Sequence, residues 1–182
     1  MGLLGRCDQY GIFTFCMAQT RVRIGDIFSV AIGEGQVRFF QYVGNDSAQL
    51  DSEVIRVYKN QYSSANAIDL ESIVVSEIDW HAHCFLRLGL KMGYWSKVGK
   101  AVIKSDIKPL FRHTYDYGRA VWQEPILVSH NWVVWHPGQD FQRVGRLAGE
   151  HEQADIGMVM SPVDIVYRMQ HGVYDMPFYP SF

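Results

Sequence analysis

Two histidines separated by one residue stand in the segment IDWHAHC, which covers residues 78–84. If this segment is a β-strand, alternate side chains point to one face, so Asp79, His81 and His83 lie together. Two imidazoles and a carboxylate are ligands that zinc uses in proteins, and a bound divalent ion can activate water for hydrolysis. A half-buried strand without any metal alternates polar and apolar residues in the same way. Since the sequence contains no second cluster of ligand residues, we expect a strand that binds no metal, with a metal-dependent hydrolase as the alternative.

Cys84 is the other side chain in this segment that could do chemistry, as the nucleophile of a covalent reaction. On a strand it faces away from the two histidines and shares a face with Trp80, so we expect a buried, unreactive thiol. The Gly-Glu-Gly segment at 33–35 lacks the Gly-Lys-Ser/Thr sequence of a phosphate-binding loop and precedes a β-type run, so it predicts a turn. The sequence thus indicates no catalytic residue and no cofactor.

Two tryptophans in the segment HNWVVWHPG, residues 130–138, are candidates for binding a protein partner. On a straight strand Trp132 and Trp135 point to opposite faces, so only one of them can line a core that covers a single face. An exposed tryptophan is a common anchor in protein interfaces, whereas the alternative is that other segments cover both faces. Glu150 and Glu152 are the expected rim of this partner surface if the chain brings them close, or else part of a solvated loop.

The overall composition narrows the class of protein. A chain of 182 residues is long enough for one hydrophobic core, so we expect a single domain. The net charge of −2 arises from scattered charged residues, which argues against a nucleic-acid-binding surface. No run of about 20 apolar residues predicts a membrane span. Three irregularly spaced cysteines do not make a disulfide framework and favour a reducing compartment, so we expect the protein in the cytoplasm.

The N-terminal segment, residues 1–16, admits two interpretations. The apolar run GIFTFCMA follows a single arginine, as in a secretion signal, but Asp8 precedes it and the run is short for such a signal. We expect instead that Met17 is an alternative start and that residues 1–16 are an extension outside the fold.

β-type sequence dominates the remaining chain. Runs at 27–32 and 37–43 flank the Gly-Glu-Gly turn and predict a hairpin. Residues 52–58 predict the next strand, and a second hairpin is expected around the turn at 137–140. The run that contains the histidines is expected to stay extended from 78 to 92, with a bend near its glycine.

Helices are predicted at two places. Asp69 is placed to cap a short helix, and the segment SPVDIVYRMQHG carries signals at both ends. Ser161 is a suitable N-cap, Pro162 suits the first helical position, and Gly172 can adopt the left-handed conformation that ends a helix. These signals predict a helix over 162–171.

The combined pattern predicts an α+β fold. We expect a mostly antiparallel curved sheet or small barrel with two or three short helices, in which the C-terminal helix covers an open end or face. The aromatic C-terminal segment VYDMPFYPSF is expected to pack back on the sheet, with a partner-binding patch as the alternative.

The segment RIGDIFSVAIGEGQVRFFQYV is a hairpin that begins with Gly-Asp and continues into an aromatic strand. It is similar to the beginning of bacterial immunity proteins of the immunity protein 26 type, which are attached to polymorphic toxin systems. The likeness covers chiefly residues 23–58. It implies a small cytoplasmic protein that binds and neutralises a cognate toxin and has no catalytic residues. Some proteins named alongside that family are described as phosphotriesterase-like, so the resemblance also admits a hydrolase.

Overall fold

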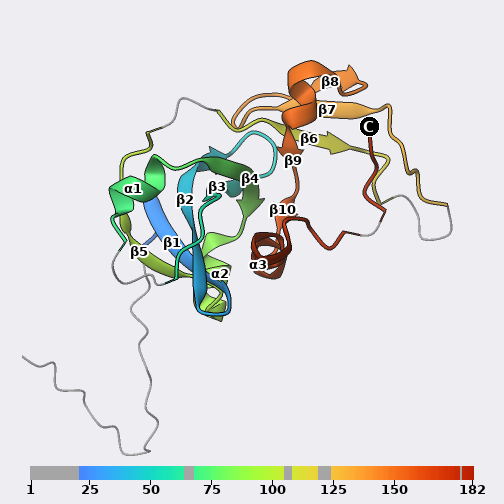
Figure 1. The fold of residues 1–182 in the computed structure, drawn as a ribbon. Coiled ribbons are helices and arrows are strands. Elements are labelled where there is room, and N and C mark those ends of the chain that lie inside the picture. Colours follow the sequence, from blue (N-terminus) through green and yellow to red (C-terminus); the bar gives the residue numbers. More distant parts are fainter. Residues whose placement is uncertain (1–20, 64–67, 105–107, 119–123, 177) are drawn as a thin grey trace, which may run out of the picture.

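The structure is a computed structural model that describes residues 21–63, 68–104, 108–118, 124–176 and 178–182. The interpretations of residues 1–16 fall outside the described residues. The described strands form two sheets, and the helices are short (Figure 1). None of these helices has the length and apolar character needed to cross a bilayer.

The larger sheet, called sheet A, has the strand order β10-β4-β3-β2-β1-β5. Its neighbours are antiparallel except for β4 and β10, which are parallel. The strands are β1 (Asp26–Gly33), β2 (Gln36–Asp46), β3 (Ser52–Tyr58), β4 (Ile78–Cys84), β5 (Ser96–Lys100) and β10 (Val159–Met160). The first predicted hairpin is confirmed, because β1 pairs with β2 and the turn residues Glu34 and Gly35 have positive φ angles of 51° and 71°.

The smaller sheet, called sheet B, has the strand order β8-β7-β6-β9. The strands are β6 (Phe111–Thr114), β7 (Trp132–Trp135), β8 (Gln142–Gly145) and β9 (Asp155–Ile156). The antiparallel pair β7 and β8 confirms the second predicted hairpin. Only Gly157 and Met158 separate β9 from β10, so this short connection ties sheet B to sheet A (Figure 1).

The helices are α1 (Leu70–Val74), α2 (Leu86–Met92), the 3-10 helix η1 (Gly149–Gln153) and α3 (Pro162–His171). Asp69 caps α1 as predicted, since its carboxylate accepts a hydrogen bond from the Glu71 amide. Helix α3 has the predicted bounds, and Gly172 ends it with a φ of 80°.

Replacing the N-cap residue Ser161 with alanine is expected to lower the free energy of unfolding by about 1 kcal/mol. Its hydroxyl accepts a hydrogen bond from the Asp164 amide, and the Asp164 carboxylate accepts one from the Ser161 amide. Urea denaturation followed by circular dichroism measures the change. Ser161→Thr keeps the hydroxyl and should retain most of the stability; an equal loss in both variants would contradict a capping role.

The prediction of an extended run from 78 to 92 is wrong in its second half. Strand β4 ends at Cys84, and the chain then turns into α2. Leu86 and Gly89 are the buried residues of this helix, at a spacing of one helical turn. A Cβ atom at Gly89 would lie 2.0 Å from the indole of Trp95, so the glycine lets the helix approach that ring. The close packing on Trp95, which sequence periodicity does not reveal, stabilises a helix here.

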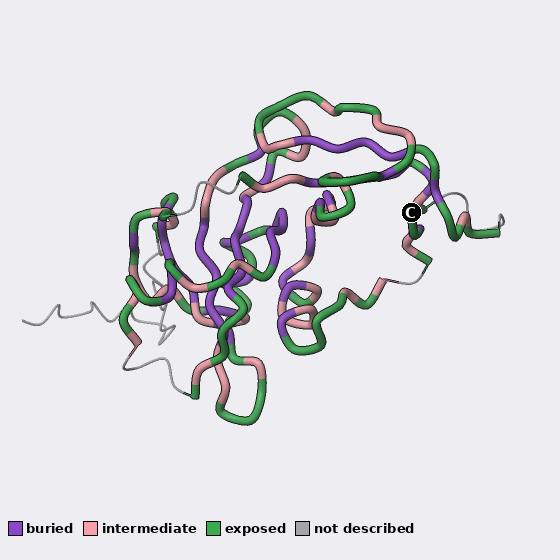
Figure 2. Tube along the Cα trace, turned by 45° about the horizontal axis from the view of Figure 1, so that its top comes forward, coloured by how far each residue is buried: buried purple, intermediate pink, exposed green. Residues whose placement is uncertain are grey.

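Both faces of sheet A are covered by other segments. Most residues of its central strands are therefore buried (Figure 2). On one face, Phe40 and Trp80 pack with Leu86 of α2 and Ile165 of α3. On the other face, Val54 packs against a group from sheet B that comprises Phe111, Val133 and Trp135. The predicted α+β fold is confirmed as two mostly antiparallel sheets; the described strands form no closed barrel.

Candidate functional site

Strand β4 places the two histidines between the sheets. Trp80, Ala82 and Cys84 belong to the core on the helix side of sheet A. His81 and His83 point the other way, toward sheet B, where the His81 amide bonds Asp155 of β9 and the His83 ring lies 4.1 Å from that of Phe111. The predicted alternation of side chains is therefore correct for these five residues of the strand.

Asp79 does not join the two histidines. The pairing of β3 with β4 shifts register between Val57 and Tyr58, which leaves Asp79 as the extra residue of a β-bulge. Its carboxylate accepts a hydrogen bond of 2.5 Å from Arg38, whose guanidinium also bonds the carbonyl of Met169 in α3. A bulge redirects a side chain, so simple alternation does not hold at this position.

His81 has partners at both ring nitrogens. Its Nε2 accepts a hydrogen bond from Nε of Arg56 at 3.3 Å, so the proton of the neutral ring is on Nδ1. That Nδ1 lies 3.4 Å from the carboxylate of Asp155, which also accepts the His81 amide at 2.8 Å and lies 3.5 Å from Arg168. The ring thus belongs to a polar network that joins β3, β4, β9 and α3.

His83 is completely buried beside Asp46 and Ser52. Its Nδ1 lies 3.0 Å from the Ser52 hydroxyl, and its Nε2 lies 3.7 Å from the Asp46 carboxylate. Burial lowers the pKa of His83 to about 4, although the Asp46 charge acts in the opposite direction. The imidazole is consequently neutral at pH 7 and cannot serve there as a proton donor in the cationic form.

Residues 78–84 also provide neither a group of metal ligands nor an activated thiol. Within the part of the chain that the structure describes, no three His, Cys, Asp or Glu side chains lie close enough together to hold a metal ion. Cys84 is buried as predicted, and burial raises the pKa of its thiol well above the ordinary value. The raised pKa keeps the thiol protonated and weakly nucleophilic at neutral pH.

Both tryptophans of β7 are buried, Trp132 at 1% and Trp135 at 2% exposure. Trp135 faces sheet A, where its indole N–H donates a hydrogen bond of 2.7 Å to Asp46. Trp132 faces away from sheet A and packs with Val134 and Leu147. The sequence left two alternatives open, one exposed tryptophan or a strand covered on both faces. In the structure both faces of β7 are covered, so neither ring is an exposed anchor.

The C-terminal segment supplies the cover on the outer face of sheet B. Tyr179 and Phe182 lie over Trp132, with ring centroids 6.1 Å away in each case. Ser181 forms a parallel β-bridge with Val128. The prediction that this aromatic segment packs back on a sheet is confirmed for Tyr174, Tyr179 and Phe182, whereas Val173 and Phe178 are exposed.

Glu150 and Glu152 lie on the exposed 3-10 helix η1. The carbonyl group of Glu152 accepts a hydrogen bond from Arg112 of β6, and its side chain is exposed. Both carboxylates are therefore available to a partner, but the structure does not place them beside an exposed tryptophan.

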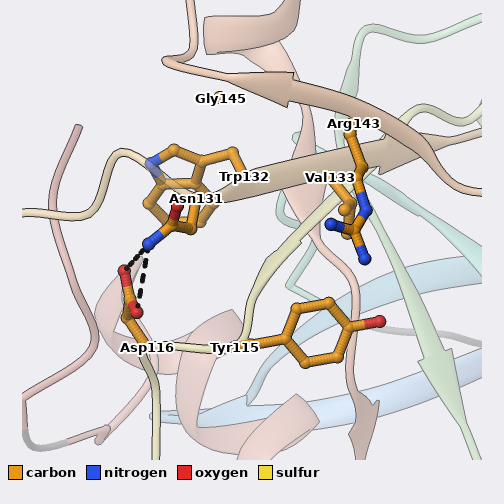
Figure 3. Close-up of a pocket in the computed structure, with 7 residues that line it drawn as sticks. All are labelled: Tyr115, Asp116, Asn131, Trp132, Val133, Arg143 and Gly145. Carbon is orange, nitrogen blue, oxygen red and sulfur yellow. Dashed lines mark hydrogen bonds between the residues drawn. The ribbon is translucent and has the colours of Figure 1, made fainter.

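A cavity opens at the end of sheet B beside β7, which we call the Tyr115 cleft (Figure 3). Its volume is about 350 Å³. Arg143 and Tyr115 flank one end of the cleft, and Asp116 and Asn131 form the other (Figure 3). The residues that line it are Tyr115, Asp116, Asn131, Trp132, Val133, Arg143 and Gly145. Trp132 and Val133 of β7 contribute to the lining, and the hairpin partner β8 brings Arg143 opposite Val133.

A buried polar network makes the Asp116 end of the cleft rigid. The Asp116 carboxylate accepts hydrogen bonds from the Ser129 hydroxyl at 2.7 Å and from the Asn131 amide at 3.1 Å. The Ser129 hydroxyl also lies 2.7 Å from that of Thr114. These bonds hold the ends of β6 and β7 together on either side of the cleft.

The opposite end of the cleft has groups available for binding. Tyr115 is 56% exposed, and Arg143 is exposed and has no carboxylate partner among the described residues. Leu127, Val128 and Phe182 are also exposed, but they lie toward the Asp116 end of the cleft, because Ser129 bonds Asp116 and Ser181 bridges Val128. An exposed arginine and an exposed tyrosine are residue types that are enriched in protein-binding surfaces.

Sequence reasoning missed both Tyr115 and Arg143. The position of Arg143 could have been predicted from the hairpin around 137–140, because the register of this hairpin decides which residue lies opposite Val133. Tyr115 has no such local signal. It follows β6, and the pairing of β6 with β7 joins segments that are distant in the chain.

Comparison of the chain with models of protein families, with curated proteins and with solved structures found no significant match.

Proposed function

We propose that this protein is a non-enzymatic, bacterial immunity-type protein that binds and neutralises a cognate toxin domain, and that the partner docks at the Tyr115 cleft. The observation that carries the proposal is the combination, at the mouth of this cleft, of an exposed tyrosine and an arginine that has no carboxylate partner among the described residues. The hairpin resemblance over residues 23–58 supports the immunity role.

The chemically capable side chains elsewhere favour binding over catalysis. His81 is engaged at both ring nitrogens, and His83 is buried in its neutral form. The Cys84 thiol is buried in the core with a raised pKa. The two histidines lie between the sheets and Cys84 lies in the core on the helix side of sheet A, so none of the three lines the Tyr115 cleft.

The chemistry of the cleft indicates which group of the partner it receives. A guanidinium binds a carboxylate through two parallel hydrogen bonds, and the neighbouring tyrosine offers both an apolar ring and a hydroxyl. The partner is therefore expected to insert an acidic side chain beside Arg143 and to cover Tyr115. Rim residues around such an anchor exclude water and add less to the affinity.

Replacing Arg143 or Tyr115 with alanine is expected to weaken binding of the toxin domain by about 30-fold, the equivalent of about 2 kcal/mol for a central anchor. Isothermal titration calorimetry with the purified toxin domain encoded by the neighbouring gene measures the dissociation constant. Arg87→Ala is the matched control, because this arginine is exposed on α2, far from sheet B (Figure 1). All three variants should keep the wild-type melting temperature.

Titration of toxin activity separates binding from enzymatic inactivation. A binding protein neutralises the toxin fully at a one-to-one ratio and not below it, whereas an enzyme inactivates many toxin molecules per chain. No inhibition at any ratio would refute the proposed function. Inhibition that persists unchanged in Arg143→Ala and Tyr115→Ala would place the docking surface elsewhere.

A further inference from the structure

A second cavity lies between the two sheets, which we call the Arg56 cavity. Its volume is about 510 Å³, within the range of small-molecule sites. Sheet A contributes Val43, Gly44, Val54 and Arg56 from β2 and β3. The turn that follows β7 closes the opposite side of the cavity. The cavity is therefore separate from the Tyr115 cleft, with which it shares no residue.

Half of the described residues that line the cavity have apolar side chains. Val43 and Val54 of sheet A face Ile103, Pro109 and Pro137 across it. Such a lining favours an aliphatic chain or an aromatic ring over a strongly hydrated ligand, because polar groups buried without partners are costly. A dianion such as phosphate would have to give up more hydration here than a single carboxylate.

Among the described residues that line the cavity, the charged groups all have the same sign. Arg56 is 2% exposed and lies at the buried part of the lining, and Lys108 is exposed. His136 adds an imidazole whose Nδ1 donates a hydrogen bond of 2.7 Å to the Pro109 carbonyl. No acidic side chain lines the cavity among the described residues. The electrostatic potential inside therefore attracts an anion.

Arg56 is held in place before any ligand arrives. Its Nε donates to Nε2 of His81, which is fixed in turn by Asp155. Burial lowers the pKa of Arg56 from its ordinary value, because the guanidinium has lost part of its hydration. Tyr58 is already a partner of this guanidinium, so a ligand carboxylate would add to a cation that is ordered beforehand and would not need to order the side chain.

From this arrangement we propose that the Arg56 cavity is a binding site for a small amphipathic carboxylate. The carboxylate lies near Arg56, and the apolar body lies between the valines of sheet A and the prolines of the facing loops. Lys108 at the surface assists entry of the anion and tunes the rate of association.

Three probes with the same ten-carbon chain test the head group: decanoate, decanol and decyltrimethylammonium. Decanoate is expected to bind at one molecule per chain and to raise the melting temperature in a concentration-dependent way. Decanol should bind at least tenfold more weakly, and the cation should not bind. Equal affinity of decanoate and decanol would overturn the proposal, because the site would then recognise only the apolar chain.

Amide chemical-shift mapping and variants test the location. Gly44 lines the cavity, and a Cβ atom there meets no heavy atom within 4 Å, so Gly44→Leu starts its side chain in open space and is designed to occupy part of the cavity. This variant should stay folded and weaken decanoate binding at least tenfold. Lys108→Gln should weaken binding several-fold and reduce its salt dependence, whereas Lys91→Gln, an exposed control on α2, should not.

Undiminished binding of decanoate to Gly44→Leu would overturn the proposal. So would amide chemical-shift changes that are confined to the exposed apolar residues of α2, Leu88 and Met92. The toxin-neutralisation assay distinguishes this inference from the proposed function. Gly44→Leu should still neutralise the toxin, since the Arg56 cavity and the Tyr115 cleft share no residue.

Discussion

Alanine at either Trp132 or Trp135 is expected to lower the free energy of unfolding by about 3–5 kcal/mol, the range for truncating a fully buried aromatic side chain. Trp132 lies under Tyr179 and Phe182 on the outer face of sheet B, and Trp135 packs with Phe111 on the inner face. Each substitution leaves a cavity that the surrounding residues can fill only in part. Because the two rings are buried in different clusters, neither substitution should be silent.

Urea denaturation monitored by circular dichroism is the appropriate measurement, since the substitutions remove the fluorescent indoles themselves. Trp135→Phe is an informative control. It keeps a ring in the cluster but removes the N–H that donates to Asp46, and is expected to lower the stability by about 1–3 kcal/mol. Wild-type stability of Trp132→Ala would contradict the packing of the C-terminal segment over this ring.

Acid is expected to destabilise the protein through His83. The imidazole has a pKa of about 4 in the folded chain and about 6.5 when unfolded. Between these values the unfolded chain takes up a proton that the folded chain does not, so the stability falls as the pH falls from about 6.5 to about 4. The full shift corresponds to roughly 3 kcal/mol, at about 1.4 kcal/mol for each pKa unit. Above pH 6.5 both states are neutral at this residue, and its contribution no longer changes.

Comparison of the wild type with His83→Gln isolates this contribution from the carboxylates that titrate in the same range. The free energy of unfolding of the variant should fall less steeply between pH 6.5 and 4. His113→Gln should reduce the slope in the same direction, since burial also lowers the pKa of His113. Parallel curves for the wild type and His83→Gln would contradict the buried neutral state of His83.

Local signals in the sequence were sufficient where one segment determines its own conformation. Helix α3 was predicted with its bounds because Ser161 and Gly172 act within one turn of the helix ends. The hairpin of β1 and β2 was predicted because its turn requires residues that tolerate positive φ. The same reasoning failed at α2, where contact with Trp95 selects a helix that the local pattern does not specify.

The candidate sites depended on contacts that sequence spacing does not contain. A β-bulge turns Asp79 toward Arg38, although its spacing from His81 suggests a shared face. Glu150 and Glu152 are exposed on η1, yet no exposed tryptophan accompanies them in the part of the chain that the structure describes. The Tyr115 cleft forms only when Tyr115 at the end of β6 meets Arg143 of β8 across β7.

The sequence by itself determined the α+β class, both hairpins, the capped helix α3 and the alternation of β4. Each of these depends on interactions between residues that are close in the chain. Only the tertiary structure decided that both tryptophans of β7 are buried, that His81 is held between Arg56 and Asp155, and which side chains remain exposed at a cleft. The physical reason is that burial depends on what covers a strand face. Here the cover comes from a second sheet and from the C-terminal segment, which alternation along one strand does not encode.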